Sequence, residues 1–557
     1  MTFNDANTKY GSAGFEHIAN IEKASLLSGK GLHVGYTRER RARQICVPST
    51  NSTLTIGNSG SGKGSTKIIP QFLDTETNIV CVDVKPEHAL IASLNILIEK
   101  YCLNGYEIGC DAPWFLPRDR MNPFDATSPA QPGFFEEALL FAMSIAEKPK
   151  GDSGGNSKHF YEKVVSLFQA IIMDGKYHNP HFSPIDLTNV VNDIATGGGE
   201  YFDFHIARMK ASPFATVGAQ ACELKSKAQM VPAEYGSIMS SASTALRPFG
   251  SPAIASMCSS PSTITPKDFV TGDSAKHLFI MFPEYAVEQS AAPIRCITTA
   301  IFIEQQRHVA RPLRFLLDEA NILGNFHLIP KIAYLGRGYK TTADIYYQNF
   351  GQIFDNFGKH ESDTILANCP YKLILGVSSQ MTAKIVSEMC GKQTYEYLPK
   401  GKRSEAAFKR SLTMQKMLVG NDMLGGMLEV ARQSRALDTP ESVARQVLNP
   451  DEVIRRAADM GLLFTSGFGL KPIQTLQKHY FLDRALVTRF LPNPQHPPFD
   501  KVIVPNRFGR MTPRNVISER VPDAISHLNQ YAEGYWSYIE GFHPLQPKRW
   551  WQLRSNT

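Results

Sequence analysis

A glycine-rich loop between a predicted strand and a predicted helix constrains this chain more than any other feature. The segment from Gly57 to Ser65 contains the pattern G-x-x-x-x-G-K. Residues 52–56 before it indicate a strand, and residues 67–73 after it have helical spacing. In such a loop the glycines let backbone N–H groups turn toward a phosphate, and the lysine reaches the outer phosphate oxygens. The predicted phosphate-binding residues are Gly57, Asn58, Ser59, Gly60, Ser61, Gly62, Lys63, Gly64 and Ser65.

Further apolar strands follow the loop, with helical segments between them. Residues 78–83 indicate a buried strand of the parallel type, and residues 294–308 indicate a helix. A strand, a glycine-rich turn, a helix and a second strand make the βαβ unit of an α/β nucleotide-binding fold. Later strands are predicted at 277–282, 313–317, 344–347 and 371–375.

The region between the first and the later strands has helical periodicity. Apolar residues recur at three- and four-residue spacing in 134–143 and in 158–168. The sequence therefore predicts an α/β fold, a RecA-like P-loop nucleotide-binding domain with a large all-α insertion domain. The predicted parts are an N-terminal segment at 1–50, the nucleotide-binding domain at 51–125 and 266–490, the all-α insertion at 126–265, and a Pro-rich, polar C-terminal tail or peripheral lobe at 491–557.

Composition limits the class of protein. Of the 557 residues, 43% are hydrophobic, which excludes wholesale disorder. Lys and Arg number 59 against 52 Asp and Glu, and the net charge of +7 permits a nucleic-acid partner without arguing for one. The nine cysteines form no C-x-x-C pair, which argues against a disulfide scaffold and a zinc ribbon and favours a reducing cytoplasm.

The sequence contains neither an apolar run of 18 residues nor a signal-peptide pattern in its first twenty residues. The best apolar candidate, 297–303, is short and is followed by Glu304 and Arg307. We therefore expect a soluble, cytoplasmic protein unless something else holds it to a membrane.

Two acidic residues end a predicted strand and complete a nucleotide site. Asp318 and Glu319 follow the apolar run 313–317. Asp318 is predicted to hold Mg²⁺ through water, and Glu319 is predicted to act as the general base that activates the attacking water. The residue after Lys63, usually Ser or Thr, is Gly64; either Ser65 reaches the metal or a water takes that place. The expected ligands are ATP and Mg²⁺.

Two further residues are candidates for sensing or stabilising the transferred phosphoryl group. Gln348 ends a predicted strand and can sense the γ-phosphate. Arg337 lies in a Gly-flanked turn before that strand and is either an arginine finger for a neighbouring subunit or an ordinary surface arginine.

Ordered motifs from about residue 55 to 485 resemble the type IV secretion coupling proteins, the TraG/TraD-like conjugative ATPases of the HerA–FtsK group. The loop with Gly64 after Lys63 is similar to the TraG-type variant, and Gln348 with Gln352 is similar to a Q-x-x-x-Q sensor. The other matching segments are 82–87, 122–125, 317–321, 365–376, 449–453 and 471–473.

The resemblance implies a homohexameric motor, assembled by substrate if not before, that delivers DNA with its relaxase, or effector proteins, to a secretion channel at the inner membrane. Its all-α insertion would recruit the substrate. Most members of the family begin with two transmembrane helices. This sequence shows none, which leaves a soluble variant, a truncated chain or recruitment by a membrane partner, and we expect the chain to be peripheral to the inner membrane.

Two other functions stay open. One is a nucleotide-gated platform that recruits protein with little turnover, which Glu319 argues against. The other is an FtsK-like double-stranded DNA pump, which the large helical insertion argues against. Nucleic-acid contacts are hypothesised at the basic cluster Arg38–Arg43 and at 548–551 with Arg554, each against the alternative of an ordinary exposed surface.

Overall fold

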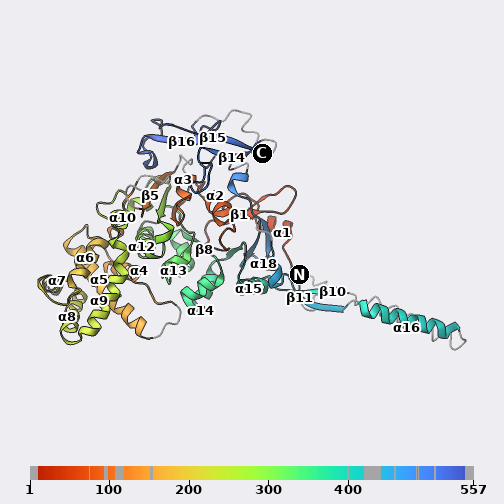
Figure 1. Cartoon of the computed structure of the whole chain (residues 1–557), viewed down its shortest axis with the longest axis horizontal. Coiled ribbons are helices and arrows are strands. Elements are labelled where there is room, and N and C mark those ends of the chain that lie inside the picture. Colours follow the sequence, from red (N-terminus) through yellow and green to blue (C-terminus); the bar gives the residue numbers. More distant parts are fainter. Residues whose placement is uncertain are drawn as a thin grey trace.

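A single large sheet forms the centre of the computed structural model (Figure 1). The structure describes residues 11–74, 76–92, 98–106, 118–150, 155–397, 400–418, 441–456, 459–483, 486, 489–506 and 510–545. In sheet order the eleven strands are β2 (Gln44–Val47), β1 (Leu32–Tyr36), β13 (Ile473–Leu476), β12 (Met460–Thr465), β9 (Tyr371–Ile374), β3 (Thr53–Ile56), β8 (Thr341–Tyr347), β7 (Leu313–Leu317), β4 (Asn78–Asp83), β6 (Lys276–Met281) and β5 (Glu99–Asn104).

The strands from β9 to β5 are parallel, and the remaining strands pair antiparallel. The central strands β3, β4 and β7 are buried along their whole length, as expected for a parallel sheet covered on both faces. The predicted strands 78–83 and 313–317 coincide with β4 and β7, and 344–347 lies within β8. Residues 32–47, assigned to an N-terminal segment by sequence, form β1 and β2 of this same sheet.

Helix α12 (Ala291–His308) packs in the core of the molecule, because every residue from Ala291 to Gln305 is buried. It contacts α4 (Phe134–Ile145), the first helix of the all-α region. The buried Arg295 donates to the carbonyl oxygens of Ser144 and Ile145 at the end of α4. This contact satisfies the free carbonyls of the helix end and fixes the helical region to the sheet domain.

The all-α region forms a bundle at the left of Figure 1. Its long helix α5 contacts α4, α6, α8 and α9, and the apolar faces of these helices continue the main hydrophobic core. The side chain of Asn122 holds the entry to this region, accepting from the Phe124 N–H and donating to Asp125 and to the Phe182 carbonyl. The helices are α5 (Gly155–His178), α6 (Pro184–Ile194), α7 (Glu200–Lys210), α8 (Ala215–Met230), α9 (Pro232–Leu246), α10 (Pro252–Met257) and α11 (Pro266–Val270).

The other helices are short or lie on the faces and the edge of the sheet. They are α1 (Ile18–Lys23), α2 (Ile69–Gln71), α3 (His88–Ile91), α13 (Leu328–Leu335), α14 (Phe350–Asn368), α15 (Gln380–Cys390) and α18 (Pro450–Ile454). An arm built from the hairpin β10 (Lys392–Tyr397) and β11 (Glu441–Gln446) and from helix α16 (Lys400–Leu418) extends away from the body (Figure 1).

The C-terminal residues fold into a lobe above the sheet, with the antiparallel strands β14 (Lys501–Pro505), β15 (Met511–Arg520) and β16 (Tyr535–Ile539) (Figure 1). Trp536 and Ile539 belong to its own small hydrophobic cluster. Gln530 joins the lobe to the edge strand β5: its amide accepts from the Lys100 N–H and donates to the Ile98 carbonyl. The lobe thereby covers backbone groups that an edge strand leaves unpaired.

Within the described residues, we find no helix whose length and apolar character would let it cross a membrane.

Candidate functional site

A cavity of about 910 Å³ lies where the carboxyl ends of β3, β4, β7 and β8 meet. Ligands of open α/β sheets bind at this edge of the parallel strands. The phosphate loop, Asp318, Glu319 and Gln348 all line this cavity, and residues 479–504 close its other side. The sequence-predicted residues of three distant segments are therefore brought together.

The loop has the backbone geometry that phosphate binding requires. Gly60 and Gly62 have φ of +77° and +84°, a left-handed conformation that strongly favours glycine. A Cβ on Gly57 would lie 2.6 Å from the Ser61 hydroxyl, so the chain turns without room for a side chain there. The loop leads directly into the π-helical turn η1 (Gly64–Ile68), whose first two residues, Gly64 and Ser65, line the cavity.

The polar groups of the loop fit an anionic phosphate. Lys63 Nζ lies over the loop and donates to the Gly57 carbonyl at 2.5 Å. Burial lowers the pKa of this lysine, and the carboxylates of Glu319 and Asp318 oppose that shift. The buried Ser61 hydroxyl and Asn58 Oδ1 have no hydrogen-bond partner among the described residues. The backbone N–H groups of the loop, the Lys63 ammonium group and the Ser61 hydroxyl are donors for phosphate oxygens in one concave site, whereas Asn58 Oδ1 can only accept.

Asp318 and Glu319 stand at the end of β7, next to the loop. Gln348, at the end of the neighbouring strand β8, donates its amide to Glu319 Oε2 at 3.2 Å. Gln348 is held in turn by Gln352, whose side-chain oxygen accepts from the Gln348 N–H at 2.9 Å. Burial raises the pKa of Glu319, and the Gln348 bond and the Lys63 charge act against this shift. The second oxygen of Glu319 is buried and has no hydrogen-bond partner in the described part of the chain, as expected of a carboxylate kept for another group.

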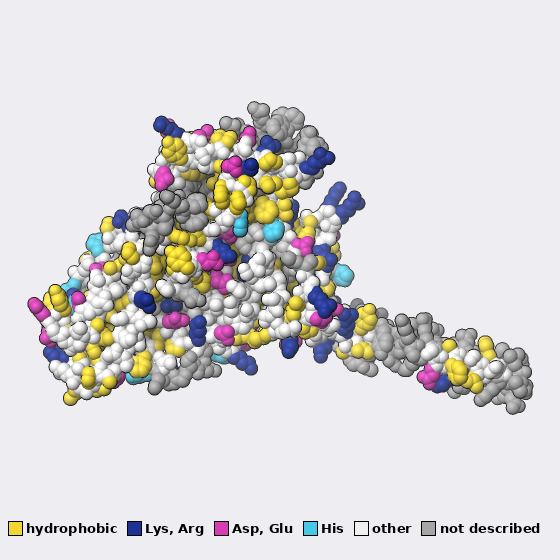
Figure 2. Space-filling view, in the orientation of Figure 1, with side chains coloured by type: hydrophobic (Ala, Val, Ile, Leu, Met, Phe, Trp, Pro, Cys, Tyr) yellow, Lys and Arg dark blue, Asp and Glu magenta, His cyan; other side chains and the backbone are white. Residues whose placement is uncertain are grey.

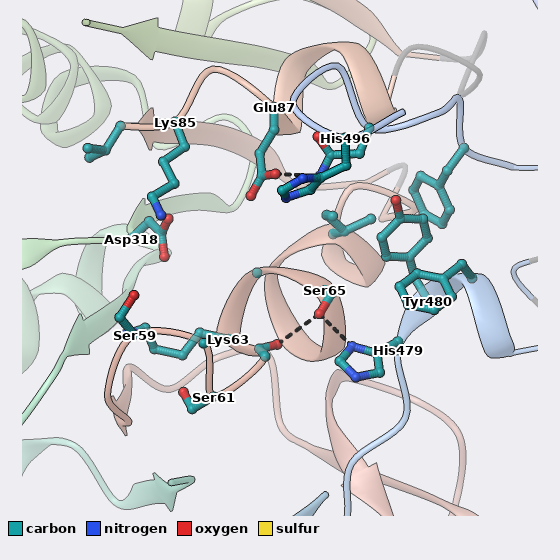
Figure 3. Close-up of a pocket in the computed structure, with 18 of the residues that line it drawn as sticks. Ser59, Ser61, Lys63, Ser65, Lys85, Glu87, Asp318, His479, Tyr480 and His496 are labelled. Atoms are coloured by element: carbon teal, nitrogen blue, oxygen red, sulfur yellow. Dashed lines mark hydrogen bonds between the residues drawn. The ribbon is translucent and has the colours of Figure 1, made fainter. Parts of the chain in front are cut away.

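The end of β4 brings a second set of charged side chains to the cavity. The buried Asp83 accepts from the backbone N–H groups of His88 and Ala89 at 2.9 and 3.2 Å, which fixes the start of α3. Lys85 points toward Asp318 (Figure 3). Burial alone lowers the pKa of His88, but the carboxylates of Asp83, Asp318 and Glu87 raise it to about 9. The Asp83-x-Lys85-x-Glu87 motif therefore lies beside the phosphate loop.

Ser65 points toward His479 on the side of the loop away from Asp318 (Figure 3). The Ser65 hydroxyl lies 2.7 Å from His479 Nδ1 and 3.3 Å from the Gly62 carbonyl. Burial lowers the pKa of His479. Nothing tests the prediction that Ser65 reaches the metal, and the contact that the structure gives it is to the imidazole.

The wall of the cavity opposite Asp318 is built largely from apolar side chains. The His479 and Phe481 rings are stacked, with centroids 5.1 Å apart and planes within 6° of parallel. Phe481 is 40% exposed although it is a large apolar residue. Figure 2 shows histidine and hydrophobic side chains beside charged ones below the C-terminal lobe. The other apolar residues of this wall are Leu486, Phe490, Leu491, Pro492, Pro497, Pro498, Val502, Ile503 and Val504.

Arg337 lies apart from the other candidates. It is exposed in the 3₁₀ turn η8 (Gly336–Tyr339), which precedes β8, whereas Gln348 follows that strand. Seven residues of strand at roughly 3.3 Å each put roughly 20 Å between the two ends. Arg337 is therefore absent from this chain's own cavity, and its donation to a neighbouring subunit stays a prediction.

Sequence reasoning missed two kinds of site residue. His88 directly follows the Asp83-x-Lys85-x-Glu87 motif, and its position was a signal that could have found it. Residues 479–504 carry no motif, and only their folded position brings them to the loop. The exposed Arg40 and Arg41 lie in the turn between β1 and β2, and the basic tail at 548–551 with Arg554 lies outside the described residues.

Comparison with known proteins defines the class. The family model described as "Type IV secretory system Conjugative DNA transfer" matches residues 10–424, which is most of the chain. The chain therefore belongs to this family, and the resemblance to type IV coupling proteins that the motifs predicted is confirmed.

The chain is similar to the type IV secretion system-coupling protein VirD4 of Bartonella henselae, with 24% identity over 193 residues, which are 34% of this chain and 28% of that protein. It is also similar to VirD4 of Bartonella quintana, with 26% identity over 140 residues, 25% of this chain and 20% of that protein. The match thus spans about a quarter of the length of these relatives.

Solved structures of the conjugative coupling protein TrwB have the same fold. The complex of TrwB with ADP and Mg²⁺ has a TM-score of 0.58 at 14% identity, covering 86% of this chain and 97% of that one. The complex of TrwB with the ATP analogue ADPNP has a TM-score of 0.57 at 15% identity, covering 86% and 96%. The predicted fold class, a RecA-like P-loop domain with a helical insertion, is confirmed.

Proposed function

We propose that this chain is an ATP-hydrolysing coupling protein that passes substrate to a type IV secretion channel. The observation that carries the proposal is the meeting of Lys63, Asp318 and the Glu319–Gln348 pair in one cavity over a glycine-constrained loop. The family match and the TrwB complexes with ADP, Mg²⁺ and ADPNP support a nucleotide as the ligand.

The polar wall of the cavity consists of the phosphate loop with Lys85, Asp318, Glu319 and Gln348, and each part has a separate role. The loop amides and Lys63 bind the β- and γ-phosphates, which fixes the transferred group in line with its attacker. Mg²⁺ would be held by Asp318 through water and would neutralise charge on the phosphate oxygens. Lys85, which points toward Asp318, adds positive charge at the same place.

Glu319 takes the proton of the attacking water. Its raised pKa fits a general base, because a more basic carboxylate accepts a proton more readily near neutral pH. Gln348 holds one oxygen of Glu319 by a 3.2 Å bond and leaves the other for water. Because Gln348 lies between Glu319 and Gln352, it can also transmit the state of the γ-phosphate to α14.

The apolar wall would contact the base and ribose of the nucleotide. Aromatic and proline side chains suit a nucleobase face, and the stacked His479–Phe481 pair offers a flat surface. The contact between His479 and Ser65 ties this wall to the phosphate loop.

The assembled form proposed here is a homohexamer with Arg337 donated to the neighbouring subunit's nucleotide. The all-α region would recruit DNA with its relaxase, or effector proteins, and the complex would dock on channel components at the inner membrane. The position of Arg337 at the sheet edge away from its own cavity supports donation in trans, since it contacts no part of its own site.

The test combines steady-state ATP hydrolysis with sedimentation, with and without single-stranded DNA, for the wild-type chain and Glu319→Gln. Assembly and stimulation by DNA, with turnover lost in Glu319→Gln, would support a DNA-coupling motor. A residual rate that is indifferent to both DNA and Glu319→Gln would contradict it and favour the recruitment platform. Arg337→Ala, mixed in increasing ratio with wild-type subunits, should lower hydrolysis if the arginine acts in trans.

A further inference from the structure

The space beside Gly64 is filled by the ring of His88. A Cβ on Gly64 would lie 3.1 Å from Cε1 and 3.8 Å from Nε2 of that ring. The backbone does not itself require glycine here, because Gly64 is not among the residues with positive φ and begins the helical turn η1. The neighbour, rather than the dihedral angle, therefore crowds a side chain at position 64.

His88 reaches the metal-side carboxylate from this position. Its Nε2 lies 3.5 Å from Asp318 Oδ2. The ring is 1% exposed and packs near Phe72, with ring centroids 6.2 Å apart. The His88 N–H donates to Asp83 at 2.9 Å, which fixes the residue at its backbone. His88 Nδ1 is buried and has no hydrogen-bond partner among the described residues.

In the usual phosphate loop, a Ser or Thr hydroxyl at position 64 would stand beside the metal and its carboxylate. Here Gly64 lacks that hydroxyl, and the imidazole Nε2 lies between Gly64 and Asp318. We infer that His88 replaces the missing hydroxyl. Its Nε2–H donates to Asp318 and orients this carboxylate for Mg²⁺, and its ring occupies the space that a side chain at position 64 would need. His88 is thus a positioning residue, and the inference rests on the proposed nucleotide site.

The arrangement makes positions 64 and 88 interdependent. A serine at 64 competes with the ring for the same space, whereas a serine at 64 beside an alanine at 88 has room for its hydroxyl near Asp318. Gly64→Ser alone should therefore weaken Mg²⁺-dependent nucleotide binding. In the His88→Ala background the same change should restore part of that binding. Residues in contact couple whatever their role, so a departure from additivity tests the shared space. The Mg²⁺ dependence of the His88 variants tests the positioning role.

The experiment titrates Mg²⁺ against binding of a fluorescent ADP analogue, with EDTA as the baseline. The chains compared are the wild type, His88→Leu, His88→Asn, His88→Ala, Gly64→Ser and Gly64→Ser/His88→Ala. His277→Leu is the matched control, because His277 is also fully buried against Phe72, with centroids 5.7 Å apart, but lies on β6 away from the loop.

His88→Leu should raise the Mg²⁺ concentration needed for half-maximal binding about tenfold or more, the usual effect of losing a group that orients a metal carboxylate. It should leave binding in EDTA unchanged. His88→Asn keeps a hydrogen-bond donor and should recover part of the loss. Gly64→Ser/His88→Ala should bind the nucleotide at a lower Mg²⁺ concentration than either single variant. His277→Leu should match the wild type. Thermal melting of every variant checks that it is folded.

Three outcomes would overturn the inference, and the third would also overturn the proposed function. If the wild type binds nucleotide but His88→Leu stays within twofold of it at every Mg²⁺ concentration, the positioning role is wrong and the proposed function stands. If the double variant shows the sum of the two single losses, the shared space is wrong. If the wild type binds no nucleotide, or binds it equally after Lys63→Ala, the proposed function and this inference both fail.

Discussion

The two walls of the cavity over the phosphate loop differ in chemistry and in origin. The first wall carries mostly half-buried polar groups on the loop and on the ends of β4, β7 and β8, and lies within the residues that the family model matches. The second wall is mainly apolar and comes from residues 479–504, beyond that match. The proposed phosphate site and the apolar wall therefore come from separate parts of the chain, so mutation can test them separately.

The largest effect should follow a change in the polar wall. Lys63→Ala removes the only ammonium group that the structure places directly over the described loop residues, and it should lower ADP affinity and ATP turnover at least about 100-fold. Equilibrium binding of a fluorescent nucleotide measures this. Lys67→Ala is not a suitable control, because Lys67 is fully buried under the loop and bonded to Thr53 and Thr55. Lys331→Ala, on α13 outside the cavity, is the matched control.

A smaller and different effect should follow a change in the apolar wall. Phe481→Ala removes one ring of the stacked pair and should weaken nucleotide binding about three- to tenfold, since stacking contacts with a base contribute about 1 kcal/mol or slightly more. The turnover number at saturating ATP should be unchanged. Phe499→Ala is the control, because Phe499 is exposed on the same segment but does not line the cavity. If Phe481→Ala lowered the turnover number as much as it lowered nucleotide affinity, the two walls would not act separately.

The attachment of the lobe to the sheet gives a third test. Gln530→Ala leaves the Lys100 N–H and the Ile98 carbonyl without their partner and should destabilise docking of the lobe by about 1–3 kcal/mol. Hydrogen exchange should then rise in β14–β16 and along the β5 edge, and not in β3 or β7. Exchange that rises throughout the sheet would show that the lobe is part of the core and not a separate cover.

A fourth test concerns pH at the same junction. Burial raises the pKa of Asp119 to about 6, although bonds from the Cys102 N–H and the Asn529 amide oppose the shift. The folded state therefore binds this proton more tightly than the unfolded state. The proton on Asp119 therefore stabilises the folded state fully below the ordinary carboxyl pKa, and this stabilisation is lost as pH rises through about 6.

Asp119→Asn should remove that loss, because an amide oxygen can still accept from Cys102 and Asn529 and the amide nitrogen can face Thr263. Melting curves should be recorded between about pH 4.5 and about pH 7.5, on both sides of about 6. Over this range the free energy of unfolding of the wild type should fall by up to about 2 kcal/mol relative to that of the variant. Parallel curves for the two chains would refute the assignment.

The polar wall could be predicted from sequence because its residues follow strands. Asp318 and Gln348 end parallel strands, and parallel strands in one sheet bring their carboxyl ends to one edge. The same logic identified the loop after β3 and the helical insertion between the strands. The role of Arg337 could not be decided, because a residue that acts on a second subunit leaves no mark on its own chain.

The apolar wall and the sheet edges could not be predicted. β1 and β2 are short, with four or five residues each, and the run 501–505 is too short to indicate a lobe. The aromatic residues at 480, 481 and 490 carry no periodicity, and tertiary contacts alone decide that they face the cavity. His88 was not predicted, because its proposed role depends on the absence of a Ser or Thr hydroxyl at position 64.

The most direct test of the account is single-turnover hydrolysis by Glu319→Gln with the bound nucleotide quantified. Glutamine keeps the size and the contact with Gln348 but cannot take a proton. Binding of ATP should match the wild type, and hydrolysis should fall about 10²- to 10⁴-fold, the usual loss for a general base. Wild-type hydrolysis by Glu319→Gln, at equal occupancy, would contradict the claim that this cavity is the active site of an ATPase.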